Sequence, residues 1–381
     1  MNQKHLFYYF IICLITFGCS SDDDSKNIHT DRNCTQILNI PDENFKAKLL
    51  SATNDINSIA TNLEGYKFKI DANNDGIIQV CEAENVSALE LDHANISNLE
   101  GLQAFKNLKN LYCNDNKLTT FDISAFKKLE EVFCQSNNIT EVNVQGLSKL
   151  KRFLCSSNQL TSLNLKSLPS LENVELRLNK ISNLNLENSN KIKYIVADNN
   201  LLSIISVKHL ADLEYLDITY NSVTSIDISN LSKVNTLQCS SNKITTLNAS
   251  NCTNLGWLHA DQNVMTELKV DNCTNLNYLN CSGNKLTALN LKGLAKLKNI
   301  HCSFNQLTTL DARDSPVVAY LDCYSNKLKS LVVRSTDPYV RYTLNLNPDL
   351  SSICCSVAEV SKIQNEINTL GYNCTITTNC F

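Results

Sequence analysis

Apolar positions recur along most of this chain at a fixed interval of 21 residues, and one asparagine marks each repeat. An apolar residue stands five positions before this asparagine, and another stands two positions after it. The asparagines that keep the interval are Asn116, Asn137, Asn158, Asn179, Asn200, Asn221, Asn242, Asn263, Asn284, Asn305 and Asn326. Asn347 is the candidate for a twelfth. Chance does not place so many asparagines in one register, so the sequence predicts a repeat architecture.

The repeat unit is L-x-x-L-x-C-x-x-N-x-L-T-x-L-x-L-x-x-L-x-x, and its L-x-C segment has a period of two. This period predicts a short strand in which Leu111 and Cys113 point inward while Tyr112 points outward. One such strand cannot bury its own apolar face, but strands of successive repeats can do so by stacking at about 4.8 Å per coil. Each column of the repeat then becomes a row of like side chains inside a solenoid.

The recurring asparagine falls where the chain turns from the strand into the return arm. Its side-chain amide offers N–H donors and an acceptor oxygen. It can therefore satisfy backbone groups of a buried turn, which a leucine at this position would leave unpaired. The asparagine column thus predicts a structural role within each turn.

These columns, from Leu89 to Val333, resemble the leucine-rich repeat family, and more narrowly the cysteine-bearing repeats of internalin-like bacterial surface proteins. The resemblance implies a β-rich solenoid, a right-handed superhelix with a parallel β-sheet on its concave face. Small helical caps are expected at both ends. The corresponding units are an N-terminal cap (34–88), a leucine-rich repeat array (89–347) and a C-terminal cysteine-rich cap (348–381).

Many of the 17 cysteines fall in a single column of the repeat. That column reads Cys113, Cys134, Cys155, Leu176, Ala197, Ile218, Cys239, Ala260, Cys281, Cys302 and Cys323. A position that accepts alanine and isoleucine is a small apolar site rather than a nucleophile or a metal ligand, and buried cysteine behaves as a small hydrophobe. Parallel side chains on neighbouring strands hold their Cβ atoms too far apart for an unstrained disulfide, so free thiols are predicted. Cys252 and Cys273 are predicted to be core substitutions in a neighbouring leucine column.

The N-terminus has the pattern of an export signal. Lys4 precedes the apolar run LFYYFIICLITFG, which is too short to span a bilayer stably. Cys19 and the acidic stretch SSDDDS follow. This resembles a bacterial lipoprotein signal (1–18) with Cys19 as the lipidated residue, a tether (19–33), and a lipid-anchored location at the outer membrane or cell surface. Thr16 stands where such signals usually have leucine, and the alternative is an ordinary secretory signal with Cys19 incidental.

The segment before the array predicts a helix followed by a calcium loop. In IPDENFKAKLLSA, Asp42 is a suitable N-cap, and Phe45 and Leu49 belong to one apolar face. The next stretch, DANNDGIIQVCE, matches the EF-hand pattern D-x-[DN]-x-[DN]-G-x5-E. The residues that would supply oxygen ligands to a structural Ca²⁺ are Asp71, Asn73, Asp75, Ile77, Gln79 and Glu82. The alternative is a polar turn that binds no ion, although three carboxylates so close together repel one another without a cation.

Cysteines outside the array are disulfide candidates in an oxidising compartment. Cys34 and Cys81 both lie in the N-terminal cap, where bridged and free states are both open. The C-terminal segment predicts a helix that begins at a capping box of Ser356 and Glu359 and ends before Gly371. Its candidate cysteines are Cys354, Cys355, Cys374 and Cys380. Because adjacent cysteines rarely bridge each other, two bonds from the first pair to the second are expected.

Charge and histidine placement argue against several functions. The net charge of −4 gives no nucleic-acid-binding footprint. His259 and His301 share a face, but they lie two coils apart, roughly 10 Å, which is too far to share a metal. The facing carboxylates Glu175 and Asp217, also two coils apart, leave a carbohydrate-processing activity as the weakest alternative. We therefore expect a monomeric protein that is not an enzyme.

Outward positions of the strands predict a binding surface, because they line the concave face of the expected solenoid. Aromatic residues stand at many of these positions and just beyond the cysteine column: Tyr112, Phe133, Tyr194, Tyr215, Tyr220, Trp257, Tyr278, Phe304, Tyr320 and Tyr324. Aromatic side chains with polar tips anchor protein interfaces and stack on sugar rings. Adhesion to, or capture of, a protein or glycan is the favoured hypothesis, in line with the internalin-like resemblance. The alternatives are strand propensity alone and a structural envelope protein that packs against other surface proteins.

Overall fold

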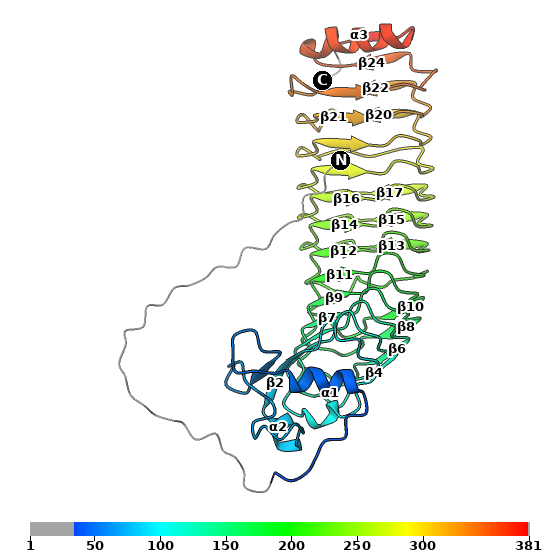
Figure 1. Cartoon of the computed structure of the whole chain (residues 1–381). Coiled ribbons are helices and arrows are strands. Elements are labelled where there is room, and N and C mark those ends of the chain that lie inside the picture. Colours follow the sequence, from blue (N-terminus) through cyan, green and yellow to red (C-terminus); the bar gives the residue numbers. More distant parts are fainter. Residues whose placement is uncertain (1–33, 380–381) are drawn as a thin grey trace, which may run out of the picture.

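The computed structural model describes residues 34–379 and confirms the predicted fold class, a parallel β-solenoid with a leucine-rich repeat core. The coils stack in sequence order between an N-terminal cap and a C-terminal helix (Figure 1). The solenoid bends in its N-terminal half, and the main sheet follows the inner side of the bend (Figure 1). No helix among residues 34–379 has the length and apolar character needed to cross a membrane. The expected signal and tether, including Cys19, lie outside the described residues.

The main sheet has 14 strands, one from nearly every coil. All neighbours pair in parallel except β1 and β2, which are antiparallel. Equivalent repeat positions face each other, so Ile195 pairs with Leu216 and Leu216 with Leu237. In spatial order the strands are β1 (Ala60–Asn62), β2 (Val86–Glu90), β3 (Asn110–Tyr112), β5 (Glu131–Phe133), β7 (Arg152–Leu154), β9 (Asn173–Glu175), β11 (Tyr194–Val196), β12 (Tyr215–Asp217), β14 (Thr236–Gln238), β16 (Trp257–His259), β18 (Tyr278–Asn280), β19 (Asn299–His301), β21 (Tyr320–Asp322) and β23 (Arg341–Thr343).

Short strands also form on the opposite side of the coils, where the sequence predicted only a return arm. They pair in parallel within four small sheets. Their bounds are β4 (Thr120–Asp122) and β6 (Glu141–Asn143); β8 (Ser162–Asn164) and β10 (Asn183–Asn185); β13 (Ser225–Asp227), β15 (Thr246–Asn248) and β17 (Glu267–Lys269); β20 (Thr309–Asp311), β22 (Ser330–Val332), β24 (Ser352–Cys354) and β25 (Thr375–Thr377).

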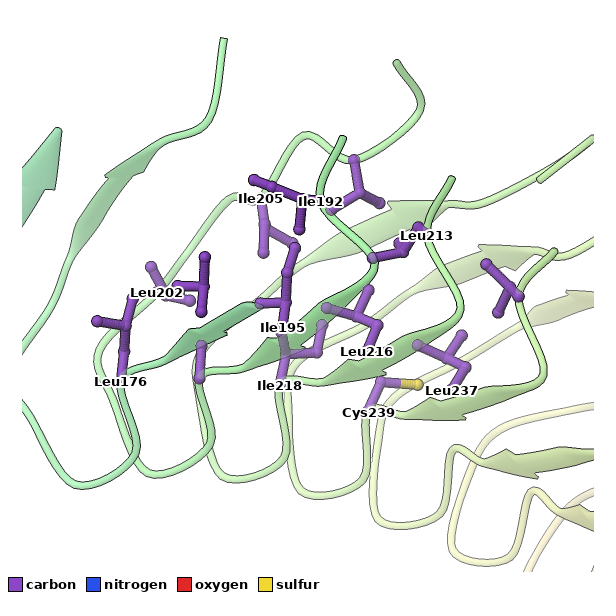
Figure 2. Packing of buried hydrophobic residues seen from close by; sticks show 14 of the residues in the cluster. Leu176, Ile192, Ile195, Leu202, Ile205, Leu213, Leu216, Ile218, Leu237 and Cys239 are labelled. Carbon is purple, nitrogen blue, oxygen red and sulfur yellow. The ribbon is translucent and has the colours of Figure 1, made fainter. Parts of the chain in front are cut away.

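The core is one continuous apolar cluster that runs from Ile40 in the N-terminal cap to Ile367 in the C-terminal helix. Each column of the repeat lies as a row inside it. Figure 2 shows the strand row of Ile195, Leu216 and Leu237, with Ile218 and Cys239 in the adjacent row. All five of these side chains are fully buried. Because apolar surface is removed from water only when coils stack, the array is stabilised by its neighbours rather than coil by coil.

The asparagine column ties each coil to the one before it. Asn158 donates from Nδ2 to the carbonyl of Cys134 in the preceding coil at 2.9 Å and to that of Cys155 in its own coil at 3.3 Å. Its Oδ1 accepts the Ile139 N–H at 2.9 Å. The same three bonds recur in every coil from Asn116 onward. Asn347 makes them as well, which confirms it as the twelfth member.

The N-terminal cap closes the first coil. Its helix α1 (Glu43–Leu50) begins at Asp42, as predicted, and Asp42 Oδ1 accepts the Phe45 N–H at 3.0 Å. The other oxygen of Asp42 accepts the Ser97 N–H at 2.8 Å, which fixes the helix to the first turn of the array. The cap also contains helix α2 (Val80–Glu84), and the 3₁₀ turn η1 (Leu102–Ala104) follows in the first coil.

The C-terminal cap consists of the 3₁₀ turn η2 (Val357–Glu359) and helix α3 (Val360–Leu370). The predicted capping box of Ser356 and Glu359 is present, and Gly371 ends the helix in a left-handed conformation. Ile363 and Ile367 lie buried against the last coil. The helix therefore covers apolar surface that the end of the array would otherwise expose.

Candidate functional site

Disulfides occur only partly where the sequence predicted them. Cys34 and Cys81 are bonded, which joins the start of the described chain to α2. Cys354 is disulfide-bonded, whereas Cys355 and Cys374 are free thiols. The expectation of two bonds in the C-terminal cap is therefore wrong: Cys355 faces the core as a fully buried side chain, while Cys374 stays partly exposed. Cys380 lies outside the described residues.

The predicted calcium loop has a hydrogen-bonded turn geometry. Asp71 accepts the N–H groups of Asp75 and Gly76, each at 3.2 Å, and Gly76 has the positive φ of 76° that this sharp turn needs. Glu82 closes the loop by accepting the N–H groups of Ala72 at 2.8 Å and Gln79 at 2.9 Å. The side chains of Asp71 and Glu82 are buried.

The chemistry of the loop fits a hard cation, because every predicted ligand atom is an oxygen. Its side chains, however, are engaged with one another: Asn73 and Gln79 both donate to Asp75 Oδ2, at 2.8 and 2.7 Å. Within residues 34–379, no three His, Cys, Asp or Glu side chains are gathered as a metal-binding group. Calcium binding by this loop therefore stays a prediction.

Chelation is the test of that prediction. Removing calcium with excess EGTA should lower the thermal midpoint of the full chain, because a ligand bound only to the native state stabilises it by about 2.7 kcal/mol at a hundredfold excess over Kd. Differential scanning calorimetry with and without calcium measures the change. A Glu82→Gln variant should no longer respond to calcium, and a wild-type melting curve that chelation leaves unchanged would contradict the prediction.

The cysteine column is a row of free, buried thiols. Burial raises the pKa of the Cys281 thiol, and likewise that of Cys323, to about 12, so both stay protonated at neutral pH. Cys252 and Cys273, in the neighbouring column, donate from Sγ to the carbonyls of Ile228 at 3.0 Å and Ala249 at 3.1 Å. Longer Sγ contacts to carbonyls also occur within the cysteine column, at Cys134, Cys302 and Cys323. The thiols therefore act as packing groups, several of them with a hydrogen-bonding role that the sequence did not predict.

At the N-terminal end of the main sheet, the predicted aromatic residues form a small cluster. The rings of Tyr112 and Phe133 lie 4.8 Å apart, and the Arg152 guanidinium lies 4.7 Å from the centre of the Phe133 ring. Tyr112 donates to Glu131 at 2.7 Å, and Arg152 pairs with the same carboxylate at 3.3 Å. Burial and this hydrogen bond raise the pKa of Tyr112 above its ordinary value.

The middle of the sheet is more polar. Tyr194 donates to Glu214 at 2.6 Å, and the hydroxyl of Tyr215 accepts from Gln238 at 2.7 Å. Glu175 and Asp217 lie on β9 and β12, with β11 between them, as their spacing predicted. Burial raises the pKa of both carboxyl groups.

A continuous row of rings in contact follows on the later strands, the first pair stacked and the next two tilted, and we call it the aromatic ladder: His259, Tyr278, His301 and Tyr320. Their successive ring centres lie 4.7, 5.2 and 5.1 Å apart. Trp257 pairs in register with Tyr278 and is 51% exposed. Burial lowers the pKa of both histidines, so neutral imidazoles are the ground state in the ladder at neutral pH.

The two histidines are functional candidates that the sequence analysis considered only as metal ligands. Both stand at the strand position that Tyr112 and Phe133 occupy in earlier coils. This shared position in the repeat is the sequence signal by which they could have been identified. The sequence also missed a polar groove of about 540 Å³ in the N-terminal half, which Glu175 and Arg177 help to line.

The remaining predicted aromatics stand at the rim, just after the strands. Phe304 and Tyr324 are in ring contact at 5.1 Å. Tyr220 and Phe304 are 60% and 57% exposed, and both have left-handed backbones, with φ of 53° and 52°. The other coils have the same left-handed backbone at this position, with Asp115, Ser136, Ser157, Leu178, Asn199, Ser241, Gln262, Gly283, Ser325 and Leu346. The left-handed conformation is therefore a feature of the turn in each coil, and Tyr220 and Phe304 differ from most other residues at this position in carrying an exposed aromatic ring.

Solved structures with the same architecture set this geometry in context. The functional domain of InlJ from Listeria monocytogenes, which includes a cysteine ladder, aligns with a TM-score of 0.63 at 24% identity over 84% of this chain and 75% of that one. YopM, a leucine-rich effector protein from Yersinia pestis, aligns with a TM-score of 0.54 at 23% identity over 70% of this chain and 76% of that one. The fold is that of a leucine-rich repeat protein.

A third leucine-rich repeat structure, the internalin InlF from Listeria monocytogenes, aligns with a TM-score of 0.50 at 19% identity over 82% of this chain and 95% of that one. Internalin-like proteins are thus among the structural neighbours, as the sequence resemblance suggested. No protein-family model and no curated protein matches the chain. At these identities the likeness concerns the fold, and the function has to be argued from the chain's own surface.

Proposed function

We propose that this protein is a non-enzymatic cell-surface lipoprotein that captures a protein or glycan ligand on its concave face. Lipid chains on Cys19 would anchor it to the outer membrane, and a calcium ion in the Asp71–Glu82 loop would stabilise its N-terminal cap. The known leucine-rich repeat folds that it resembles are compatible with a binding role. The proposal rests mainly on the aromatic ladder and on Trp257 beside it.

Core packing does not account for these rings. The apolar residues of the same strands, such as Leu258 and Leu279, are fully buried and already fill the interior. Trp257 leaves half of its surface in water, and the ladder residues are half-buried rings that carry hydroxyl or imidazole groups. Flat side chains that combine apolar area with polar tips, held in place by one another, are typical anchors of a binding interface.

Two exposed aromatic residues at the rim support the same conclusion. Tyr220 and Phe304 leave 60% and 57% of their surface in water, and Phe304 is in ring contact with Tyr324. Aromatic side chains are enriched in binding interfaces. These two residues extend the proposed surface from the ladder to the rim of the sheet.

Trp257→Ala tests the function. The soluble chain that starts after Cys19 is applied to an array of extracellular proteins and glycans, and each hit is then titrated by surface plasmon resonance. We expect the substitution to weaken binding by roughly 2 kcal/mol or more, about thirtyfold, because it removes a central anchor. Tyr278→Ala should act in the same direction.

Tyr339→Ala is the matched control, since Tyr339 is 84% exposed and lies in a turn outside the main sheet. It should leave binding unchanged, and circular dichroism should show all three variants folded. Hits that survive both ladder-side substitutions, or an array without hits, would contradict the proposal and favour a structural envelope role.

A further inference from the structure

A polar groove crosses the coils at the N-terminal end of the concave side. Its volume of about 540 Å³ lies in the range of small-molecule sites, about 300–1,000 Å³. Its lining comes from Glu175 on β9, from Val196 on β11, and from residues that follow the strands of four earlier coils, among them Asn114, Gln135 and Ser156. The groove is thus built by the register of the coils, and no single repeat contains it.

Glu175 is an unusual carboxylate in this groove. It is half-buried, and within residues 34–379 its side chain has no hydrogen-bond partner. The carboxylates on neighbouring coils are all engaged: Glu131 by Tyr112, Asp198 by Arg177, and Asp217 by the Thr219 N–H. Its carboxylate lines the groove with its acceptor oxygens open to solvent, so Glu175 is placed to receive donors from a ligand.

The charges around the groove select the kind of ligand. Arg152 and Arg177 both act electrostatically on Glu175 and disfavour a cation beside it. Asp92 and Asp115 line the same groove and disfavour an anion. Opposing fields of this kind leave a neutral ligand as the best fit.

Neutral polar groups make up much of the rest of the lining. Within the described chain, the side chains of Gln135, Ser136 and Ser157 make no hydrogen bonds to other protein groups. Asn114 uses its Oδ1 to accept the Gln135 N–H at 2.9 Å, and its N–H₂ group donates to no protein group among residues 34–379. The groove therefore offers several donors and acceptors at once, which suits a ligand that carries many hydroxyl groups.

We infer that this groove is a binding site for a neutral saccharide, with Glu175 accepting hydrogen bonds from sugar hydroxyl groups and the surrounding amides and serines completing the contacts. The rings of Tyr112 and Phe133 lie on the same face, on neighbouring strands, where they can stack on further sugar units of a longer chain. The inference deepens the proposed function, because it assigns a ligand class to one end of the concave face.

Isothermal titration calorimetry of the full-length chain tests the inference with cellohexaose, maltohexaose, mannohexaose, xylohexaose and chitohexaose. Heparin and spermine serve as the anionic and cationic probes. At least one neutral hexasaccharide should bind, and more tightly than either charged probe. Glu175→Gln should weaken that binding at least about tenfold, because hydrogen bonds to a charged acceptor are roughly twice as strong as neutral ones. Gln135→Ala should weaken it as well.

Two controls separate the outcomes. Glu187→Gln changes an exposed carboxylate after β10, on the opposite side of the coil, and should have no effect. Tyr339→Ala changes an exposed ring outside the main sheet and should also have no effect. The calorimetry relies on variants of the groove alone, so failure of the ladder as a binding surface does not decide the result. The inference is overturned if no neutral hexasaccharide binds, if heparin or spermine binds more tightly, or if folded Glu175→Gln and Gln135→Ala proteins both bind like wild type.

Discussion

Replacing Asn158 with leucine should lower the free energy of unfolding by roughly 3–5 kcal/mol, a loss at the upper end for a single substitution. Leucine would remove both donors to the carbonyls of Cys134 and Cys155 and the acceptor for the Ile139 N–H. All these groups are buried, and each one left without a partner costs about 1–3 kcal/mol. Several hydrogen bonds between two neighbouring coils would be lost at once, so the loss of stability should exceed that from one missing hydrogen bond.

Asn158→Asp separates the donor role from the acceptor role. The shape is kept, and one oxygen can still accept the Ile139 N–H, but a carboxylate faces carbonyl oxygens instead of donating to them. Its pKa in the folded state should therefore rise above the unfolded value of about 3.9. The destabilisation should be full at neutral pH and should weaken as the pH falls through the raised pKa, because the protonated acid can donate again.

Urea denaturation followed by circular dichroism measures both variants. Asn138→Leu is the matched control, because Asn138 lies in the same kind of turn but is exposed, and it should change stability by less than about 0.5 kcal/mol. If Asn158→Leu costs no more than this control, water must be satisfying the turn, and the asparagine column would not be what joins the coils.

Glu359→Ala should lower the free energy of unfolding by roughly 3 kcal/mol or more and should detach the C-terminal cap. The buried Glu359 carboxylate accepts from the Ser335 N–H at 2.9 Å, from the hydroxyl of Tyr342, and from the N–H and hydroxyl of Ser356 at 3.0 and 2.7 Å. One side chain thereby links β23, which is the last strand of the main sheet, the loop that precedes β23, and the start of the C-terminal cap.

Two effects make this site sensitive. Burial, followed by the hydrogen bond to Glu359, raises the pKa of Tyr342 well above its ordinary value, so a neutral tyrosine donates to the carboxylate. Alanine would leave that hydroxyl and the Ser335 N–H without partners in a buried site. Without the cap, Ile363 and Ile367 would also leave the apolar surface of the last coil.

Hydrogen exchange measured by mass spectrometry locates the damage. Protection should fall in α3 and the last coils while the N-terminal coils keep theirs, because each coil contacts mainly its neighbours. Glu366→Ala removes a half-buried acid from the same helix and should have a small effect. Unchanged protection of α3 in Glu359→Ala would show that apolar contacts alone hold the cap.

The fold could be derived from sequence largely because the repeat restricts it so strongly. A column such as Leu216 and Leu237 has one arrangement that buries every member, which is stacking in register. The second rows of strands, from β4 to β25, were less predictable, because a three-residue strand depends on the neighbouring coil for its hydrogen bonds. The disulfides of the C-terminal cap were also hard to predict. Cys374 lies in a loop, and no sequence pattern determines the distance between that loop and Cys355.

The sequence by itself determined the 21-residue coil, the inward and outward columns, the asparagine ties and the two caps, since periodicity and side-chain chemistry act locally and repeat. The tertiary structure decided which outward residues meet. Stacking places Tyr278 between two histidines, and it joins residues of separate coils into the polar groove that Glu175 helps to line. The physical reason is that contacts between coils depend on both the strand register and the bend of the solenoid. Neither property is contained in a single repeat.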